Sequence, residues 1–275
     1  MPTIDSHIHF WKFDKNRYAW INDSMKSLQK DHLPEHVAQT FQRNGIDGCI
    51  AVQAATSEFE TDFLVELSHT HPVIKGVVGW VDLAAPNAAS RLEHYASNPV
   101  IKGYRHIVQS EPDDYMNGTG FRQGIAALAA YQYTYDILIY PRQLKAAIDL
   151  VSEFPEQVFI LDHCGKPEIR RGKPDEWKDK IRRLAAFPNV YCKLSGLFTE
   201  APWKAWSAGD FYPYLDVVFE NFTANRLLFG SDWPVMLLSG MYVQWKSLLE
   251  KYMQGMIPDD HEAVFGGNAV NVYRL

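Results

Sequence analysis

The chain has 275 residues, 47% of them hydrophobic and 22% charged, with a net charge of −6. This length suits a single α/β barrel of about 250 residues, and the composition is that of an ordinary globular protein. The acidic balance and the lack of a basic run argue against a nucleic-acid-binding protein, because phosphate backbones would be repelled.

Eight short apolar runs divide the chain from end to end. Most are nearly continuous in apolar and β-branched residues, which is typical of parallel strands covered on both faces. In chain order they span residues 3–8, 48–53, 74–81, 100–106, 133–139, 158–162, 190–194 and 227–230. Amphipathic stretches lie between them, with apolar residues at helical spacing, as at Leu144, Ala147, Ile148 and Val151.

Eight strands that alternate with helices predict an α/β protein with the (β/α)8 TIM-barrel fold, as one domain of residues 1–275. An open doubly wound sheet is the competing fold, but no glycine-rich turn of the dinucleotide-binding type follows an early strand. Long connections follow four of the strands, at residues 10–33, 107–119, 164–173 and 196–209. In a barrel they lie at the carboxyl ends of the strands, where substrates bind.

The first and the eighth of these strands end beside residues that are able to bind a cation or move a proton. The first ends with His7 and His9, which point to the same side because strand residues two apart share a face. The eighth is followed by Asp232, and strands 1 and 8 are neighbours in a closed barrel. Two imidazoles and a carboxylate form a binding set for one divalent metal ion. The alternative is that Asp232 only caps the following turn.

His163 and Arg105 also lie at strand ends, after the sixth strand and at the end of the fourth. A histidine there would face the same barrel mouth, although a lone histidine is as often a hydrogen-bonded structural residue. Arg105 could hold a carbonyl oxygen or a developing oxyanion, or pair with an acid of a nearby loop.

The segments DSHIHFW, KGYRH, LDHCGKP and FGSDWP together resemble the amidohydrolase superfamily. Within it the chain resembles the amidohydrolase family 2 group of L-fuconolactonase-like and L-rhamnonolactonase-like sugar lactonases, to which 2-pyrone-4,6-dicarboxylate lactonase is related. The resemblance covers essentially the whole chain. It implies a lactone hydrolase with His7, His9, His163 and Asp232 in its active site, and with His7, His9 and Asp232 as metal ligands.

Two departures from the superfamily pattern limit the expected metal content. The fifth strand offers Asp136 where a metal-binding histidine is common, and Arg105 and His106 stand where the fourth strand often carries a bridging lysine. We therefore expect at most one divalent ion, Zn²⁺, or none at all.

The expected reaction opens a lactone to its hydroxy acid. Asp232 takes a proton from water, the water attacks the carbonyl, and His7, His9, Arg105 or a metal holds the oxyanion, while His163 orients the carbonyl or the water. Aromatic and polar side chains near the strand ends are candidates for binding a sugar-like ring; they are Trp11, Gln53, Trp80, Arg105, His106, Lys166 and Trp233. The alternative is that about half of the tryptophans only fill loops.

Two other functions remain open: a metal-dependent decarboxylase of an aromatic or unsaturated acid, and a catalytically inactive sugar-binding barrel. The first residues show no signal peptide and no apolar run approaches the ~18 residues of a spanning helix. Three scattered cysteines suit a reducing compartment. We expect a cytoplasmic protein, monomeric or homodimeric, that binds a small lactone and neither nucleic acid nor membrane.

Overall fold

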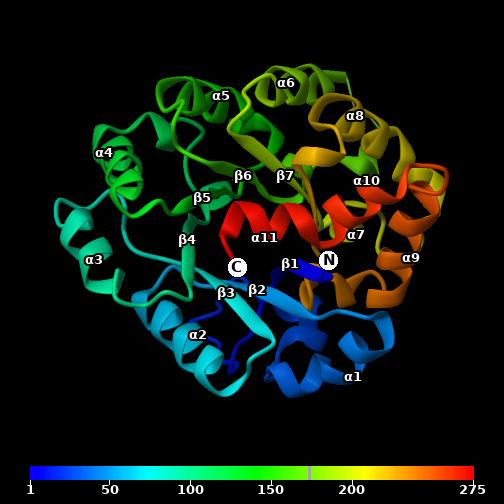
Figure 1. The fold of residues 1–275 in the computed structure, drawn as a ribbon, viewed down its shortest axis with the longest axis horizontal. Helices are drawn as coiled ribbons and strands as arrows, with labels where there is room; N and C mark the ends of the chain where they lie inside the picture. The colour runs from blue at the N-terminus through cyan, green and yellow to red at the C-terminus, as the bar shows by residue number, and fades with distance from the viewer. Residues whose placement is uncertain (173–174) are drawn as a thin grey trace.

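The computed structural model describes residues 1–172 and 175–275 (Figure 1). Its strands are all parallel and hydrogen-bonded in the order of the sequence. They are β1 (Ile4–Ile8), β2 (Gly48–Val52), β3 (Ile74–Gly79), β4 (Ile101–His106), β5 (Thr134–Ile137), β6 (Phe159–Leu161), β7 (Val190–Leu194) and β8 (Leu227–Phe229). The predicted TIM-barrel fold is confirmed.

Helices surround the strands as an outer ring, and a short helix near both termini covers one end of the barrel (Figure 1). The α-helices are α1 (Pro34–Asn44), α2 (Glu58–Thr70), α3 (Ala88–Tyr95), α4 (Thr119–Leu128), α5 (Leu144–Glu153), α6 (Asp175–Ala185), α7 (Leu197–Glu200), α8 (Tyr212–Phe222), α9 (Tyr242–Tyr252), α10 (Pro258–Glu262) and α11 (Asn268–Tyr273). Among the described residues, no helix is long and apolar enough to cross a membrane.

The apolar core has two layers, as expected for strands covered on both faces. The larger layer lies between the strands and the outer helices. The smaller one fills the barrel interior, where Ile4, Val52 and Leu228 form one buried cluster with Val272 and Tyr273 of α11. The chain's last helix therefore closes the barrel at the amino ends of the strands and leaves the carboxyl ends open to the long loops.

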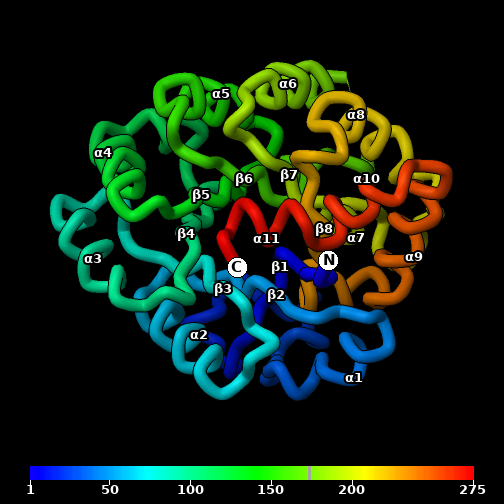
Figure 2. Tube along the Cα trace, viewed as in Figure 1, coloured from blue at the N-terminus to red at the C-terminus, as the bar shows by residue number. Residues whose placement is uncertain are grey.

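β8 lies beside β1, so that the first and last strands close the barrel (Figure 2). Ser6 Oγ donates to the Phe229 carbonyl at 2.6 Å. Beyond the end of β8, Asp232 N donates to the His7 carbonyl and His9 N to the Trp233 carbonyl, each at 2.8 Å. The barrel therefore closes through the backbone of the residues that were predicted to carry the chemistry.

The predicted strands agree with the structure to within one or two residues at each end. Gln53, Val81, Ile139 and Asp162 were predicted as strand residues and lie just beyond the observed strand ends. Of the predicted loop 164–173, Lys173 lies outside the described residues.

Candidate active site

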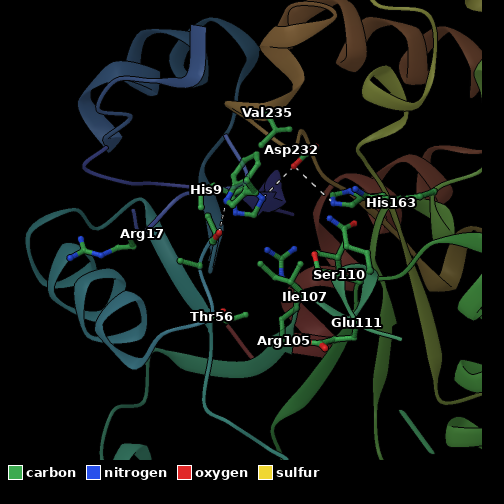
Figure 3. Close-up of a pocket in the computed structure, with 17 residues that line it drawn as sticks. His9, Arg17, Thr56, Arg105, Ile107, Ser110, Glu111, His163, Asp232 and Val235 are labelled. Carbon is green, nitrogen blue, oxygen red and sulfur yellow. Dashed lines mark hydrogen bonds and ion pairs between the residues drawn. The ribbon is translucent and has the colours of Figure 1, made fainter. Parts of the chain in front are cut away.

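A cavity of about 300 Å³ opens at the carboxyl ends of the strands (Figure 3). It is within the usual size range of small-molecule sites. The loops after β1, β2, β4, β5, β6 and β8 all contribute to its wall. The lining residues are His9, Arg17, Ala19, Trp20, Ala54, Ala55, Thr56, Arg105, Ile107, Gln109, Ser110, Glu111, Leu138, His163, Lys166, Asp232 and Val235.

His7, His9 and Asp232 come together at the cavity floor, where His9 and Asp232 line the cavity and His7 is fully buried next to them. The Nε2 atoms of the two histidines lie 3.2 Å apart, and Asp232 Oδ1 is 3.3 Å from His9 Nε2 and 3.9 Å from His7 Nε2. Ligands of a tetrahedral zinc ion with bonds of about 2.1 Å lie roughly 3.4 Å apart. The three atoms therefore have the chemistry and the spacing of a zinc-binding set, and these residues form one of the two candidate metal-binding groups in the described part of the chain.

Hydrogen bonds behind the two histidines turn their Nε2 atoms toward the cavity. His9 Nδ1 lies 2.7 Å from the Val52 carbonyl, which only accepts, so the proton is on Nδ1. Arg105 Nη1 lies 3.2 Å from His7 Nε2, and a guanidinium only donates. His7 Nε2 is therefore an acceptor, and the proton of the neutral ring is on Nδ1, which lies 3.2 Å from Asp162 Oδ1 and also 3.3 Å from Lys193 Nζ. A metal ion on His7 Nε2 would require Arg105 to release that nitrogen.

His163 faces Asp232 from the turn after β6. Its Nε2 lies 4.0 Å from Asp232 Oδ1, and its Nδ1 lies 2.9 Å from Ser195 Oγ. Both residues have left-handed backbone, with φ of 54° for His163 and 60° for Asp232. Non-glycine residues seldom adopt this conformation, and such strain is concentrated at functional sites. Gly196 packs so closely on the His163 ring that a Cβ there would overlap it.

A group of buried charges lies beneath His7. Lys193 Nζ is 2.5 Å from Asp136 Oδ2 and 3.1 Å from Asp162 Oδ1, and Arg105 Nη1 is 2.9 Å from Asp162 Oδ2. Tyr273 of α11 donates to Asp136 Oδ2 at 3.1 Å. Two carboxylates thus face two cations, as buried charges require. Sequence reasoning did not find Asp162 or Lys193 and regarded Asp136 only as a substitute for a missing histidine.

Burial and the neighbouring charged groups shift the pKa values of His7, His163 and Asp232. Burial lowers the pKa of His7 and of His163 well below the usual value, which favours neutral imidazoles. Burial alone would raise the pKa of Asp232, but His163, His9 and Lys166 more than offset it, and the pKa lies below its ordinary value. An ionised carboxylate beside neutral imidazoles suits both cation binding and proton acceptance.

Of the side chains predicted to bind substrate, Arg105 and Lys166 line the cavity. The described lining residues do not include the other five, because these side chains pack behind the wall. Trp11 is fully buried, with its Nε1 bonded to the Lys30 carbonyl at 2.9 Å. Gln53 Nε2 donates to the Arg105 carbonyl at 3.1 Å.

The other predicted substrate-binding residues that lie behind the cavity wall are Trp233, Trp80 and His106. Trp233 is 5% exposed and packs on Phe10. Trp80 Nε1 donates to His106 Nδ1 at 3.0 Å. The tryptophan that does line the cavity is Trp20, 37% exposed. A direct substrate-binding role for the residues behind the wall stays a prediction without support from their positions.

An eight-stranded parallel barrel with one histidine at the end of β1, one directly after it, a histidine after β6 and an aspartate after β8 defines a class of barrel hydrolases with a candidate metal site. The family described as Amidohydrolase matches residues 4–275. The chain belongs to the amidohydrolase family, as its resemblance predicted.

Two related sequences and one solved structure are similar to this chain over nearly its whole length. An L-fucono-1,5-lactonase of Burkholderia multivorans is 37% identical over 99% of this chain and 96% of its own length. The L-fucono-1,5-lactonase of Burkholderia ambifaria is 33% identical over 99% and 95%. The crystal structure of an amidohydrolase from Burkholderia multivorans with bound zinc superposes with a TM-score of 0.96, at 37% identity and 100% coverage of both chains.

Proposed function

We propose that this protein hydrolyses a sugar lactone to the corresponding hydroxy acid. The observation that carries the proposal is the position of Asp232, whose Oδ1 lies within 4.0 Å of three imidazoles at the floor of a cavity of small-molecule size. The names of two relatives that match nearly the whole chain support the substrate class.

We also propose that His7, His9 and Asp232 hold at most one Zn²⁺ ion. The spacing of their ligand atoms and the zinc-bound structure of a relative support this. When bound, the ion would polarise the lactone carbonyl and acidify water. The second candidate group, His7, Asp162 and His163, is less suitable, because Asp162 is already paired with two cations.

In the proposed reaction Asp232 accepts a proton from the attacking water. The oxygen of that water bonds to the lactone carbonyl carbon, and the ring C–O bond then breaks. The ring oxygen leaves as an alkoxide and takes up a proton to become a hydroxyl group. Arg105, which lines the cavity, would hold the carbonyl oxygen as it gains negative charge, whereas the Nε2 atoms of His7 and His9 carry no proton and cannot donate to it.

The variant Asp232→Asn tests the role of the carboxylate. It keeps the shape of the side chain but removes the basic oxygen, so kcat for lactone hydrolysis should fall by about 10²–10⁴. A pH-indicator assay with a panel of five- and six-membered aldonolactones measures this, with the exposed Asp114→Asn as the matched control. Parental activity in Asp232→Asn would overturn the mechanism. If no lactone reacts and an aromatic acid loses CO₂, the protein is a decarboxylase.

We further propose that the enzyme acts in the cytoplasm, as a monomer or homodimer, on a small molecule rather than on a nucleic acid or a membrane. The net charge of −6 supports the exclusion of nucleic acid. Its three buried free cysteines suit a reducing compartment.

A further inference from the structure

Three side chains, one after β3, one at the end of β4 and one after β4, form a hydrogen-bonded chain that ends at the cavity. Trp80 Nε1–H lies 3.0 Å from His106 Nδ1, and His106 Nε2 lies 2.9 Å from Glu111 Oε1. An indole nitrogen only donates, so His106 Nδ1 accepts and its Nε2 carries the proton. That proton is donated to Glu111. The direction of every bond in the chain is therefore fixed.

The His106 ring is held rigidly in this orientation. It stacks on Tyr115, with the ring centroids 4.9 Å apart and the planes 13° from parallel. Its side chain is 9% exposed, whereas that of Glu111 is 34% exposed. The buried His106 and the half-buried Trp80 and Tyr115 thus hold a partly exposed carboxylate in place at the cavity wall.

The second carboxylate oxygen of Glu111 is available to a ligand. Within residues 1–172 and 175–275, no protein donor lies within hydrogen-bond distance of Oε2. Glu111 lines the cavity beside Ser110, and it follows β4, which is opposite β8 in the barrel. Figure 3 shows Glu111 on the side of the cavity away from Asp232. A ligand whose carbonyl is at Asp232 would therefore extend toward Glu111.

We propose that Glu111 is a specificity-determining residue that accepts a hydrogen bond from a hydroxyl group on the lactone, with Trp80 and His106 as its positioning residues. This inference rests on the proposed function and deepens it. The substrate is then a neutral lactone that carries hydroxyl groups on the side of the ring away from the reacting carbonyl.

The charge of Glu111 also discriminates against anionic ligands. The other acid at the wall, Asp232, lies at the opposite side, and Lys166 is partly neutralised by Glu200 at 3.7 Å. A lactone with a carboxylate in place of its distal hydroxymethyl group would meet Glu111 directly. Like charges in contact repel, so the end of the cavity at Glu111 disfavours a terminal carboxylate, although Arg17, Arg105 and Lys166 also line the cavity.

The variant Glu111→Gln separates the charge from the shape. His106 Nε2–H still requires an acceptor, so the amide oxygen stays on His106 and the NH₂ group faces the cavity. The acceptor and the negative charge are thereby lost with little change of geometry. Asp114→Asn, an exposed acid of the same loop, is the matched control.

The test measures binding by calorimetry, so that it does not depend on turnover. The probes are hydrolytically stable lactams of a neutral aldonic acid, of its counterpart with a terminal carboxylate, and of its counterpart without the distal hydroxyl. We expect wild type to prefer the neutral lactam and Glu111→Gln to reduce that preference about 10-fold or more, as for a charge-assisted hydrogen bond. The lactam without the hydroxyl should bind wild type and variant alike.

A preference within twofold of wild type in Glu111→Gln would overturn the inference. So would an equal loss in Asp114→Asn, because the effect would then be one of general charge. Lactone turnover is assayed separately: if no lactone is hydrolysed while the lactams still depend on Glu111, the proposed reaction fails and the binding role of Glu111 stands.

Discussion

Replacing Lys193 with methionine would remove one of the four charges beneath His7. Lys193 is fully buried, and its ammonium contacts the carboxylates of Asp136 and Asp162 at 2.5 and 3.1 Å. Methionine is similar in length, so the main change is that two buried carboxylates face only the Arg105 cation. Removal of one partner of a buried ion pair typically costs about 3–5 kcal/mol. We expect Lys193→Met to lower the free energy of unfolding by that amount at pH 8.

The cost should depend on pH, because burial raises the pKa of Asp136 to about 6 while Lys193 lowers it. A folded pKa above the unfolded value means that the stability from this group is present at low pH and lost as pH rises through about 6. Without Lys193 the pKa of Asp136 rises further, so the variant protonates this carboxyl at higher pH than wild type. The penalty should therefore shrink between pH 8 and pH 5.

Urea unfolding followed by circular dichroism at both pH values measures these free energies. Lys145→Met breaks an exposed pair with Asp149 and should cost less than about 0.5 kcal/mol. The double variant Lys193→Met/Asp136→Asn leaves one cation and one carboxylate, so it should recover part of the loss. A loss below about 1 kcal/mol for Lys193→Met at pH 8, or an equal loss at both pH values, would refute this account of the buried charges.

Two further predictions concern the cavity floor. Gly196→Ala should displace the His163 ring and lower kcat/KM by about 10²-fold. The control is Gly45→Ala, which has a similar φ (+64° against +67°) but no atom within 4 Å of the added Cβ, and which should leave kcat/KM unchanged. Equal kcat/KM in both variants would show that the position of the ring is unimportant. Elemental analysis should find at most one zinc per chain. Chelation should lower the Tm, and added zinc should restore the Tm because an ion that binds only the folded protein stabilises it by mass action. Two tightly bound zinc ions per chain would contradict a single site.

The fold was predictable because each parallel strand is covered on both faces and is therefore apolar along its length. The exact ends of the strands were less predictable, since the residue after a buried strand is often as apolar as the residues within it. Val81 and Ile139 illustrate this: both are fully or nearly fully buried, yet they lie in the loops.

The site was only partly predictable. Strand-end position placed His7, His9, His163 and Asp232 at one mouth, and the structure brings them together. Lys193 has the same penultimate strand position as Arg105, and a lysine within the apolar run VYCKL needs a buried partner, but the sequence does not indicate which distant carboxylates provide it.

The prediction that tryptophans after the strands bind the substrate failed to account for how the loops fold. Sequence indicates that Trp11 follows a strand, but not that the next loop folds over it. In the structure Trp11 packs with Tyr18 and Leu28 of that loop. Which side of a loop faces the ligand depends on contacts between distant segments, and these have no local sequence signal.

The line of hydrogen bonds between β1 and β8, called the seam here, is needed both for the stability of the barrel and for its activity. The hydrogen bonds that join His7 to Asp232 and His9 to Trp233 are the last ones that close the cylinder. A mutation that loosens this seam would therefore move the carboxylate away from the imidazoles. Natural selection for activity therefore also acts on barrel closure, and damaged variants should lose function while most of their secondary structure persists.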